Sequence, residues 1–204
     1  MKKLIIALIV LFTVHTIKAQ KTEETDFIPY QNTLPTIDNS GTVKTADGRT
    51  FKIEGFKDTA TTIFFLVRHA EKDTTAGVDA DLIGTGRGRA EALVKIFKKI
   101  KISGVYSTST PRTRHTAEPL AKFKRRPVDI YDVKKQDELV KKLIARGGGR
   151  RYFIVGHSNT VPKLALQILG GNKTAENIPE SEYSRLYIVS AKKMGRAKVE
   201  IINF

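Results

Sequence analysis

A run of five apolar residues, Ile63 to Val67, ends abruptly in Arg68 and His69. An unbroken apolar run of this length predicts a strand that is buried on both faces, as in a parallel sheet. Open α/β sheets bind their ligands at the carboxyl ends of such strands. Burying an arginine and a histidine there is costly unless an anion meets them. The junction therefore predicts an anion site, and we expect a phosphate group that His69 attacks.

Strand and helix patterns alternate along the rest of the chain. Apolar runs and turn residues predict strands over 62–67, 104–107, 127–131, 152–156, 185–191 and 198–204. Helical spacing predicts helices over 86–100, from Pro111 onward, over 136–146 and over 161–169. Such alternation predicts an α/β fold, a three-layer α/β/α sandwich with a mostly parallel central sheet. The main domain is expected to span residues 61–204.

The segment before the main domain carries two further signals. Residues 1–19 combine Lys2 and Lys3 with an apolar run and a small residue, Ala19, at a plausible cleavage point. This pattern predicts a signal peptide, with a membrane-anchoring helix as the alternative. Residues 20–60 read as a polar lead-in with a β-hairpin around Asp47-Gly48. We therefore expect an exported protein, periplasmic or secreted, without a membrane span once the signal is removed.

The composition of the chain limits which cofactors and binding partners are expected. The 204 residues and an apolar content of 40% suffice for one domain with a full core. The chain has no cysteine, which excludes disulfides and thiolate metal sites, and its four histidines lack metal-ligand spacing, so neither a metal nor another cofactor is expected. The net charge of +15 favours anionic partners. Interleaved aromatic residues for base stacking are not evident, so no specific nucleic acid is expected.

Two further places in the chain offer groups that suit a phosphate. A second buried strand ends in His157, and a predicted helix begins with Pro111-Arg112. Helix N-termini bind anions through free backbone N–H groups, and an arginine adds a bidentate fork. If the fold joins these groups to Arg68 and His69, the four cationic side chains surround a phosphoryl group and stabilise its equatorial oxygens. A histidine nucleophile would split hydrolysis into phosphoryl transfer to nitrogen and attack by water.

Three segments carry a resemblance to a known family. They are Arg68-His69-Ala70-Glu71, the stretch from Ser107 to Ala117, and Val155-Gly156-His157-Ser158-Asn159-Thr160. Together, and in this order, they resemble the motifs of the histidine phosphatase superfamily, with its phosphoglycerate mutase-like fold, over residues 62 to about 169. The resemblance implies that His69 is the phosphorylated nucleophile. It also implies that Arg68, Arg112 and His157 form the phosphate pocket.

Departures from the family pattern favour its short phosphatase branch. Ala70 stands where the mutase branch carries glycine, and the chain has no tryptophan for that branch's Ser-x-Trp-Asn continuation. Many members take their general acid from the segment after the third strand or from the position after the second histidine. Ser158 follows His157 here, which leaves Asp132, Asp137 and Glu138. We assign the acid to Asp132, because the other two suit a helix start.

The resulting hypothesis is an exported phosphomonoesterase, of the histidine acid phosphatase type, that works through a phosphohistidine at His69. Small phosphate esters or phosphate groups of envelope glycans are the expected substrates. Two alternatives stay open: a catalytically weak module that binds phosphate or anionic glycans, and a phosphoglycerate mutase-type phosphotransferase. His115 is expected to be structural, and Thr116 a helix residue rather than a phosphate contact.

Overall fold

The structure is a computed structural model that describes residues 34–171 and 174–204. The predicted signal peptide, residues 1–19, and the first part of the lead-in lie outside these residues. Within the described part of the chain, no helix is both long and apolar enough to cross a membrane.

A six-stranded sheet forms the centre of the molecule, in the order β6-β5-β7-β4-β8-β9. Its strands are β4 (Thr62–Arg68), β5 (Gly104–Ser107), β6 (Val128–Ile130), β7 (Arg151–Gly156), β8 (Arg185–Lys193) and β9 (Arg196–Asn203). The first four in spatial order are parallel, whereas β8 runs antiparallel to β4 and β9 antiparallel to β8. The two antiparallel strands are the closing pair that the sequence predicts.

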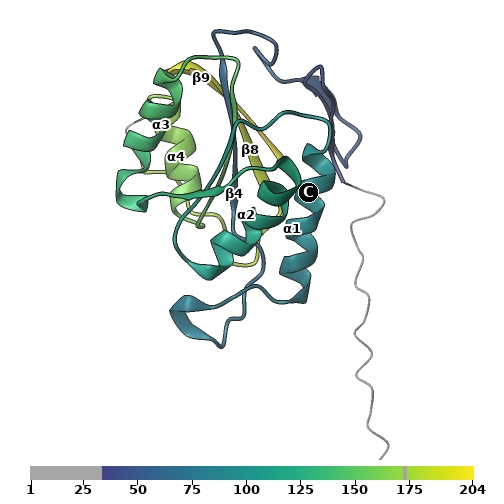
Figure 1. The fold of residues 1–204 in the computed structure, drawn as a ribbon, viewed down its shortest axis with the longest axis vertical. Coiled ribbons are helices and arrows are strands. Elements are labelled where there is room, and N and C mark those ends of the chain that lie inside the picture. Colours follow the sequence, from purple (N-terminus) through teal and green to yellow (C-terminus); the bar gives the residue numbers. More distant parts are fainter. Residues whose placement is uncertain (1–33, 172–173) are drawn as a thin grey trace, which may run out of the picture.

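Helices cover both faces of this sheet, as Figure 1 shows, with α3 and α4 on one side and α1 and α2 on the other. Their bounds are α1 (Gly84–Phe97), α2 (Pro111–Lys124), α3 (Gln136–Ala145) and α4 (Thr160–Ile168). Two 3-10 turns, η1 (Gly77–Asp79) and η2 (Val133–Lys135), precede α1 and α3. Alternate residues of β4 enter two separate apolar cores: Phe65 packs with the α1 and α2 side, Phe64 with the α3 and α4 side. The predicted three-layer α/β/α sandwich is confirmed.

The hairpin predicted around Asp47-Gly48 is present as part of a small separate sheet. Strands β1 (Thr36–Ile37), β2 (Thr42–Lys44) and β3 (Thr50–Lys52) pair antiparallel, and Gly48 takes the positive φ that the tight turn requires. Ile37 and Val43 are fully buried and belong to the core cluster that includes Phe97 of α1. The small sheet therefore packs against the α1 side of the main domain (Figure 1).

Close packing of α1 against the end of β4 depends on one glycine. A β-carbon at Gly86 would lie 2.1 Å from the carbonyl oxygen of Glu71, only two residues beyond His69. The helix begins at Gly84, two residues before the predicted start, and Ala90, Leu93 and Phe97 form its buried face as the spacing predicts. Gly86 thus lets the first turn of α1 touch the backbone that follows the strand.

This contact predicts opposite effects for two neighbouring glycines. Gly86→Ala should lower the free energy of unfolding by about 1–3 kcal/mol, because the new methyl group meets backbone that cannot move aside cheaply. Gly88→Ala should raise it by about 0.5–1 kcal/mol, because nothing lies within 4 Å of its added β-carbon and alanine favours a helix. Urea unfolding of the two variants tests this, and equal effects would contradict the packing argument.

Candidate active site

His69 follows the last residue of β4 and is 3% exposed. Its backbone N–H donates to the carbonyl of Gly156 at the end of β7, which holds the two strand ends together. The Nδ1 atom lies 2.8 Å from the carbonyl oxygen of Ala70. A carbonyl only accepts, so Nδ1 carries the proton of the neutral ring. The Nε2 atom is then left with the lone pair that a nucleophile needs.

The fold brings His69 and His157 together. Their strands, β4 and β7, are parallel neighbours with Arg68 opposite Gly156, so the residues that follow the two strands share one edge of the sheet. The two ring centroids are 5.7 Å apart, and the ring planes meet at 68°. The Nε2 atom of His157 lies 3.0 Å from the hydroxyl of Thr108, in the loop after β5. That hydroxyl also donates to Thr113, so a network from three segments positions the second imidazole.

Both histidines are neutral in the site over a wide pH range. Burial lowers the pKa of His69 to about 3, and the nearby charges of Arg68 and Arg112 act in the same direction. Burial lowers the pKa of His157 to about 4, again with help from Arg112 and Arg68. The hydrogen bond to Ala70 works the other way on His69 but is outweighed. The arrangement keeps an unprotonated nitrogen beside two permanent positive charges.

Arg68 is held almost entirely by the loop that follows α4. Its side chain is 1% exposed, and Nη1 donates to the carbonyls of Pro179, Glu180 and Glu182 at 2.8, 3.1 and 3.1 Å. Nη2 donates to the carboxylate of Glu180, and the guanidinium lies 4.3 Å from the ring centre of Tyr183. The buried Nε atom has no protein partner. A buried guanidinium group that has an unused N–H beside two histidines is well placed to bind an anion.

Arg112 lies in the first turn of α2, directly after Pro111 at the first helical position. Its Nη1 donates to the carbonyl of Val78 at 2.6 Å, while its buried Nε has no protein partner. Burial lowers the pKa of Arg112, and the charge of Arg68 adds to that effect. Arg114, on the same helix, is exposed and lies 3.9 Å from Glu118, so Arg112 is the arginine of this motif that joins the site.

Two contacts fix the segment after His69 in place. The hydroxyl of Thr116 accepts from the Ala70 N–H at 2.9 Å and donates to the Arg112 carbonyl at 2.7 Å. The carboxylate of Glu71 pairs with Arg89 of α1 through three short hydrogen bonds, in a largely buried position. Thr116 therefore links α2 to the segment that follows β4, and Glu71 links the same segment to α1.

The sequence-predicted site residues separate into two groups. Arg68, His69, Arg112 and His157 converge, as their contacts and mutual electrostatic influence show. Asp132 precedes η2, is exposed, and accepts from the backbone N–H of Lys134 at 2.8 Å, where it caps the turn. No described contact joins Asp132 to either histidine, and its role as the acid stays a prediction. His115 pairs with Asp81 at the edge of α2.

Sequence reasoning missed the residues that the 174–184 loop contributes. Glu180 accepts from Arg68 and, at 2.9 Å, from the hydroxyl of Ser158, the residue after His157. The ring of Tyr183 lies 6.0 Å from that of His69. This stretch looks like an ordinary polar loop in the sequence, because nothing local reveals that it folds back over β4. The loop is anchored in the structure by Ile178, which is fully buried.

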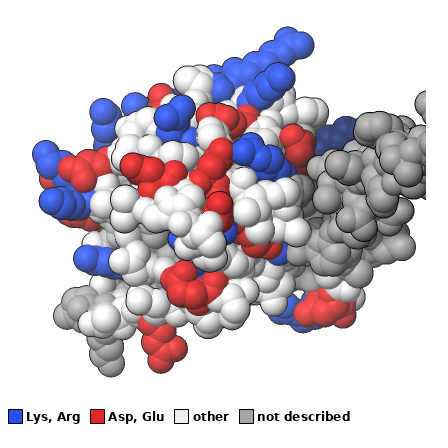
Figure 2. All heavy atoms as spheres, turned by 90° about the horizontal axis from the view of Figure 1, so that it is seen from below, with Lys and Arg blue, Asp and Glu red and all other residues white. Residues whose placement is uncertain are grey.

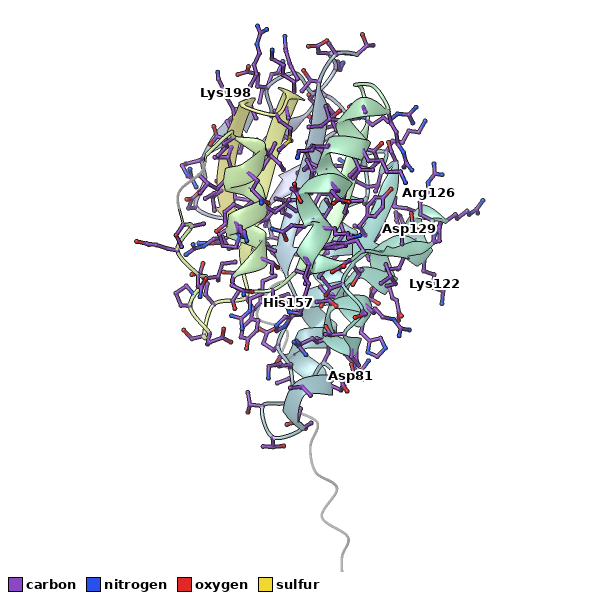
Figure 3. All side chains as sticks on the ribbon, turned by 90° about the vertical axis from the view of Figure 1, so that its left-hand side faces the viewer. Asp81, Lys122, Arg126, Asp129, His157 and Lys198 are labelled. Atoms are coloured by element: carbon purple, nitrogen blue, oxygen red, sulfur yellow. The ribbon has the colours of Figure 1, made fainter. Side chains whose placement is uncertain are left out.

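The end of the molecule that carries these groups has a mixed charge. In Figure 3, His157 and Asp81 lie toward the lower end, whereas Lys198 lies near the opposite one. Figure 2 views the molecule from below and shows acidic side chains near the middle of that face, with basic ones mainly toward its margins. The described residues contain no group of three or more His, Asp or Glu side chains that could hold a metal ion.

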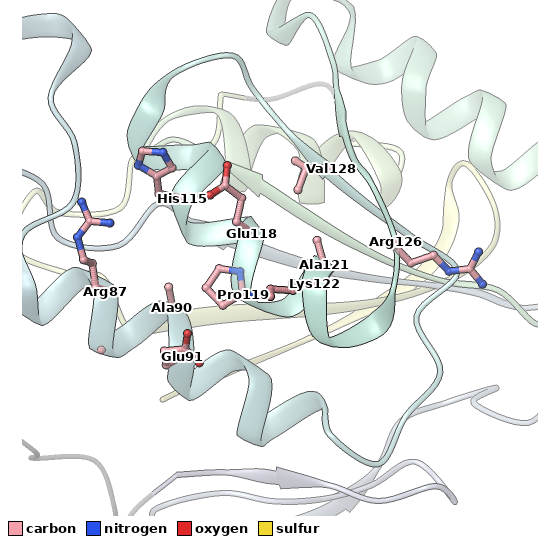
Figure 4. Close-up of a pocket in the computed structure, with 11 residues that line it drawn as sticks. Arg87, Ala90, Glu91, His115, Glu118, Pro119, Ala121, Lys122, Arg126 and Val128 are labelled. Atoms are coloured by element: carbon pink, nitrogen blue, oxygen red, sulfur yellow. The ribbon is translucent and has the colours of Figure 1, made fainter.

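A separate groove of about 670 Å³ lies between α1 and α2. Figure 4 shows Arg87 and Glu91 reaching it from α1 and His115 and Glu118 reaching it from α2. None of Arg68, His69, Arg112 and His157 lines this groove. The candidate chemistry therefore lies at the strand ends and not in this groove.

Comparison with known proteins agrees with the motifs and the fold. The family model of the histidine phosphatase superfamily (branch 1) matches residues 64–133, which include most of β4 and all of α1 and α2, with Arg68, His69 and Arg112. A search among curated proteins finds no match to the chain. The family match over residues 64–133 and the fold agree with the resemblance to the histidine phosphatase superfamily, and the fold is phosphoglycerate mutase-like.

Solved structures share the fold at low sequence identity. The protein histidine phosphatase SixA, complexed with tungstate, is 17% identical, with a TM-score of 0.59 over 69% of this chain and 96% of that one. A mycobacterial glucosyl-3-phosphoglycerate phosphatase is 14% identical, with a TM-score of 0.58 over 70% and 99%. A phosphoserine phosphatase from Entamoeba histolytica is 14% identical, with a TM-score of 0.54 over 70% and 96%.

The lowered pKa values predict how stability depends on pH. Below the ordinary pKa of 6.5, the unfolded chain takes up a proton at each site imidazole, while the native state stays neutral down to pKa values of about 3 and 4. Native stability from these groups is therefore complete above pH 6.5 and falls as the pH decreases toward those values. We expect a His69→Gln/His157→Gln variant to lose less stability than the wild type between about pH 7 and pH 4.5. Thermal unfolding at several pH values measures this, and parallel curves would contradict it.

Proposed function

We propose that the protein is a phosphomonoesterase that hydrolyses phosphate esters through a phosphohistidine at His69. The observation that carries the proposal is the pair of neutral imidazoles 5.7 Å apart, the buried His69 and the partly buried His157, flanked by Arg68 and Arg112. A neutral nitrogen attacks phosphorus, and two guanidinium groups offset the charge of the phosphoryl oxygens. The match of residues 64–133 to the family model and the phosphatases among the structures of similar fold support the same reaction class.

The first half-reaction follows from the tautomer of His69. The Nδ1–H donated to Ala70 leaves the Nε2 lone pair free to attack the phosphorus atom. As the N–P bond forms and the P–O bond to the leaving group breaks, positive charge develops on the ring. The carbonyl of Ala70 stabilises that charge through the Nδ1–H bond. Arg68, Arg112 and His157 hold the three equatorial oxygens of the phosphoryl group.

In the second half-reaction water attacks phosphorus opposite the N–P bond, and His69 leaves as the neutral imidazole. Inorganic phosphate is then the product, and no metal is needed for either step of this scheme. We expect small phosphate esters or phosphate groups of envelope glycans as substrates. The basic composition of the chain and the leader-like residues 1–19 support both the choice of anionic substrates and export.

Replacing the nucleophile should separate catalysis from folding. His69→Ala is expected to lower turnover of p-nitrophenyl phosphate by about 1,000-fold or more, because it removes the nitrogen that attacks phosphorus. His115→Ala is the matched control: it also removes an imidazole, but His115 pairs with Asp81 outside the site. Rapid quenching in alkali should trap a phosphoryl group on the wild type that is labile to acid. Unchanged turnover of His69→Ala, with a wild-type circular dichroism spectrum, would refute the proposal.

Export has its own expected outcome. When the full chain is expressed in a bacterium with a periplasm, the mature protein should begin at Gln20, because Ala19 supplies the small residue before cleavage. Cell fractionation followed by N-terminal sequencing checks this. Recovery of the chain in the cytoplasm with its first residues intact would contradict export while leaving the phosphatase assignment untouched.

A further inference from the structure

The carboxylate of Glu180 occupies the mouth of the candidate site. One oxygen accepts from Nη2 of Arg68, and the other accepts from the Ser158 hydroxyl at 2.9 Å. The carboxylate is close enough to both His69 and Arg112 for their charges to influence one another. Its side chain is nevertheless 74% exposed, whereas the Arg68 side chain beneath it is 1% exposed. Glu180 therefore bridges the floor of the site and the solvent.

The other carboxylates near the site have different partners. Glu71 is tied to Arg89 by three hydrogen bonds, and the Glu182 carboxylate is tied to Arg185 at 2.6 and 2.8 Å. Asp81 pairs with His115 and Arg87. Asp79, in η1, acts on Arg112 only through its charge. Among the described residues, Glu180 is thus the carboxylate that is hydrogen-bonded to the proposed phosphate-binding groups.

The direction in which His69 attacks phosphorus indicates a role for the carboxylate of Glu180. In phosphoryl transfer the nucleophile and the leaving oxygen lie on opposite sides of phosphorus. His69 is buried at the floor, so an ester enters with its phosphate inward and its leaving oxygen toward the mouth. The exposed carboxylate of Glu180 stands on that outer side. A poor leaving group departs as an alcohol only if a proton reaches its oxygen there.

We propose that Glu180 is the general acid and base of this site, an inference that rests on the proposed phosphatase function. When the ester's P–O bond breaks, the carboxylic acid of Glu180 gives its proton to the leaving oxygen, and the alcohol departs. The carboxylate so formed takes a proton from water as the water oxygen bonds to phosphorus. The electron pair of the breaking N–P bond returns to His69. Glu180 is protonated again at the end of the cycle.

The contacts of Glu180 also set when it carries a proton. Burial opposes its ionisation, but hydrogen bonds from Ser158 and Arg68 and the charge of Arg68 outweigh that effect and lower its pKa. A phosphate that binds Arg68 takes over this partner and adds negative charge, and both changes raise the pKa of the carboxyl group. Proton uptake is therefore linked to substrate binding, and activity toward poor leaving groups should decline as the pH rises.

The test compares Glu180→Gln with the wild type on two substrates that differ only in their leaving group. A phenyl phosphate bearing a nitro group needs no acid, whereas a simple alkyl phosphate does. For Glu180→Gln we expect kcat/KM to fall by about 100- to 10,000-fold on the alkyl ester and by less than about 10-fold on the nitrophenyl ester. Glu176→Gln is the matched control, because it removes the same charge from an exposed position of the same loop. Asp79→Asn tests the remaining carboxylate near Arg112.

The possible outcomes distinguish a wrong assignment of Glu180 from a wrong assignment of the phosphatase activity. An equal loss on both substrates, or none, overturns the role of Glu180 while wild-type hydrolysis upholds the phosphatase. A lower inhibition constant for inorganic phosphate with equal gains on both substrates also overturns it, because Glu180 then merely competes for Arg68. If Asp79→Asn shows the leaving-group-dependent loss in place of Glu180→Gln, the acid is Asp79. A wild type that hydrolyses neither ester refutes the phosphatase and this inference together.

Discussion

Desolvation of His69 and Arg68 at the end of β4 is the constraint on which the site depends. A buried imidazole stays neutral because ionisation there would cost more than in water, and the two nearby guanidinium groups strengthen that bias. The burial is possible only because polar partners are supplied. Ala70 accepts from the ring, and three carbonyls of the 179–182 segment accept from Arg68. Arg68 can then lie in the interior as a cation, beside the neutral ring of His69, with carbonyl oxygens and the exposed carboxylate of Glu180 as its partners.

The need for polar partners of buried arginines joins segments that lie far apart in the chain. Arg68 is in the first strand of the main sheet, whereas its carbonyl partners lie more than a hundred residues later. Arg89 of α1 likewise donates to the carbonyl of Phe204, the last residue, and to Glu71 beside the site. The antiparallel strand β8 lies directly against β4 and brings this late segment alongside the site. The pocket is therefore completed by parts of the chain that carry none of its recognisable motifs.

Much of the fold could be predicted from local patterns. The strands were foreseeable because buried runs such as 63–67 and 152–156 leave few alternatives, and Pro111 and Gly48 marked a helix start and a turn. Helix ends were less predictable, since α1 stops at Phe97 and not at Ile100. The general acid was the least predictable feature. Asp132, the acid that the sequence predicts, caps a turn, and its role stays a prediction; Glu180, the acid that we propose, contacts Arg68 from a loop that carries no motif.

The sequence by itself determined the chemical groups of the site: two histidines and two arginines, each at the end of a buried strand or at the start of a helix. Apolar runs and turn residues act over a few positions, so they reveal where such groups stand along the chain. The tertiary structure alone decided that these groups meet, which imidazole nitrogen is free, and which carboxylate faces them. Those features depend on strand order and on the path of the 174–184 loop, which arise from contacts between residues far apart in the chain.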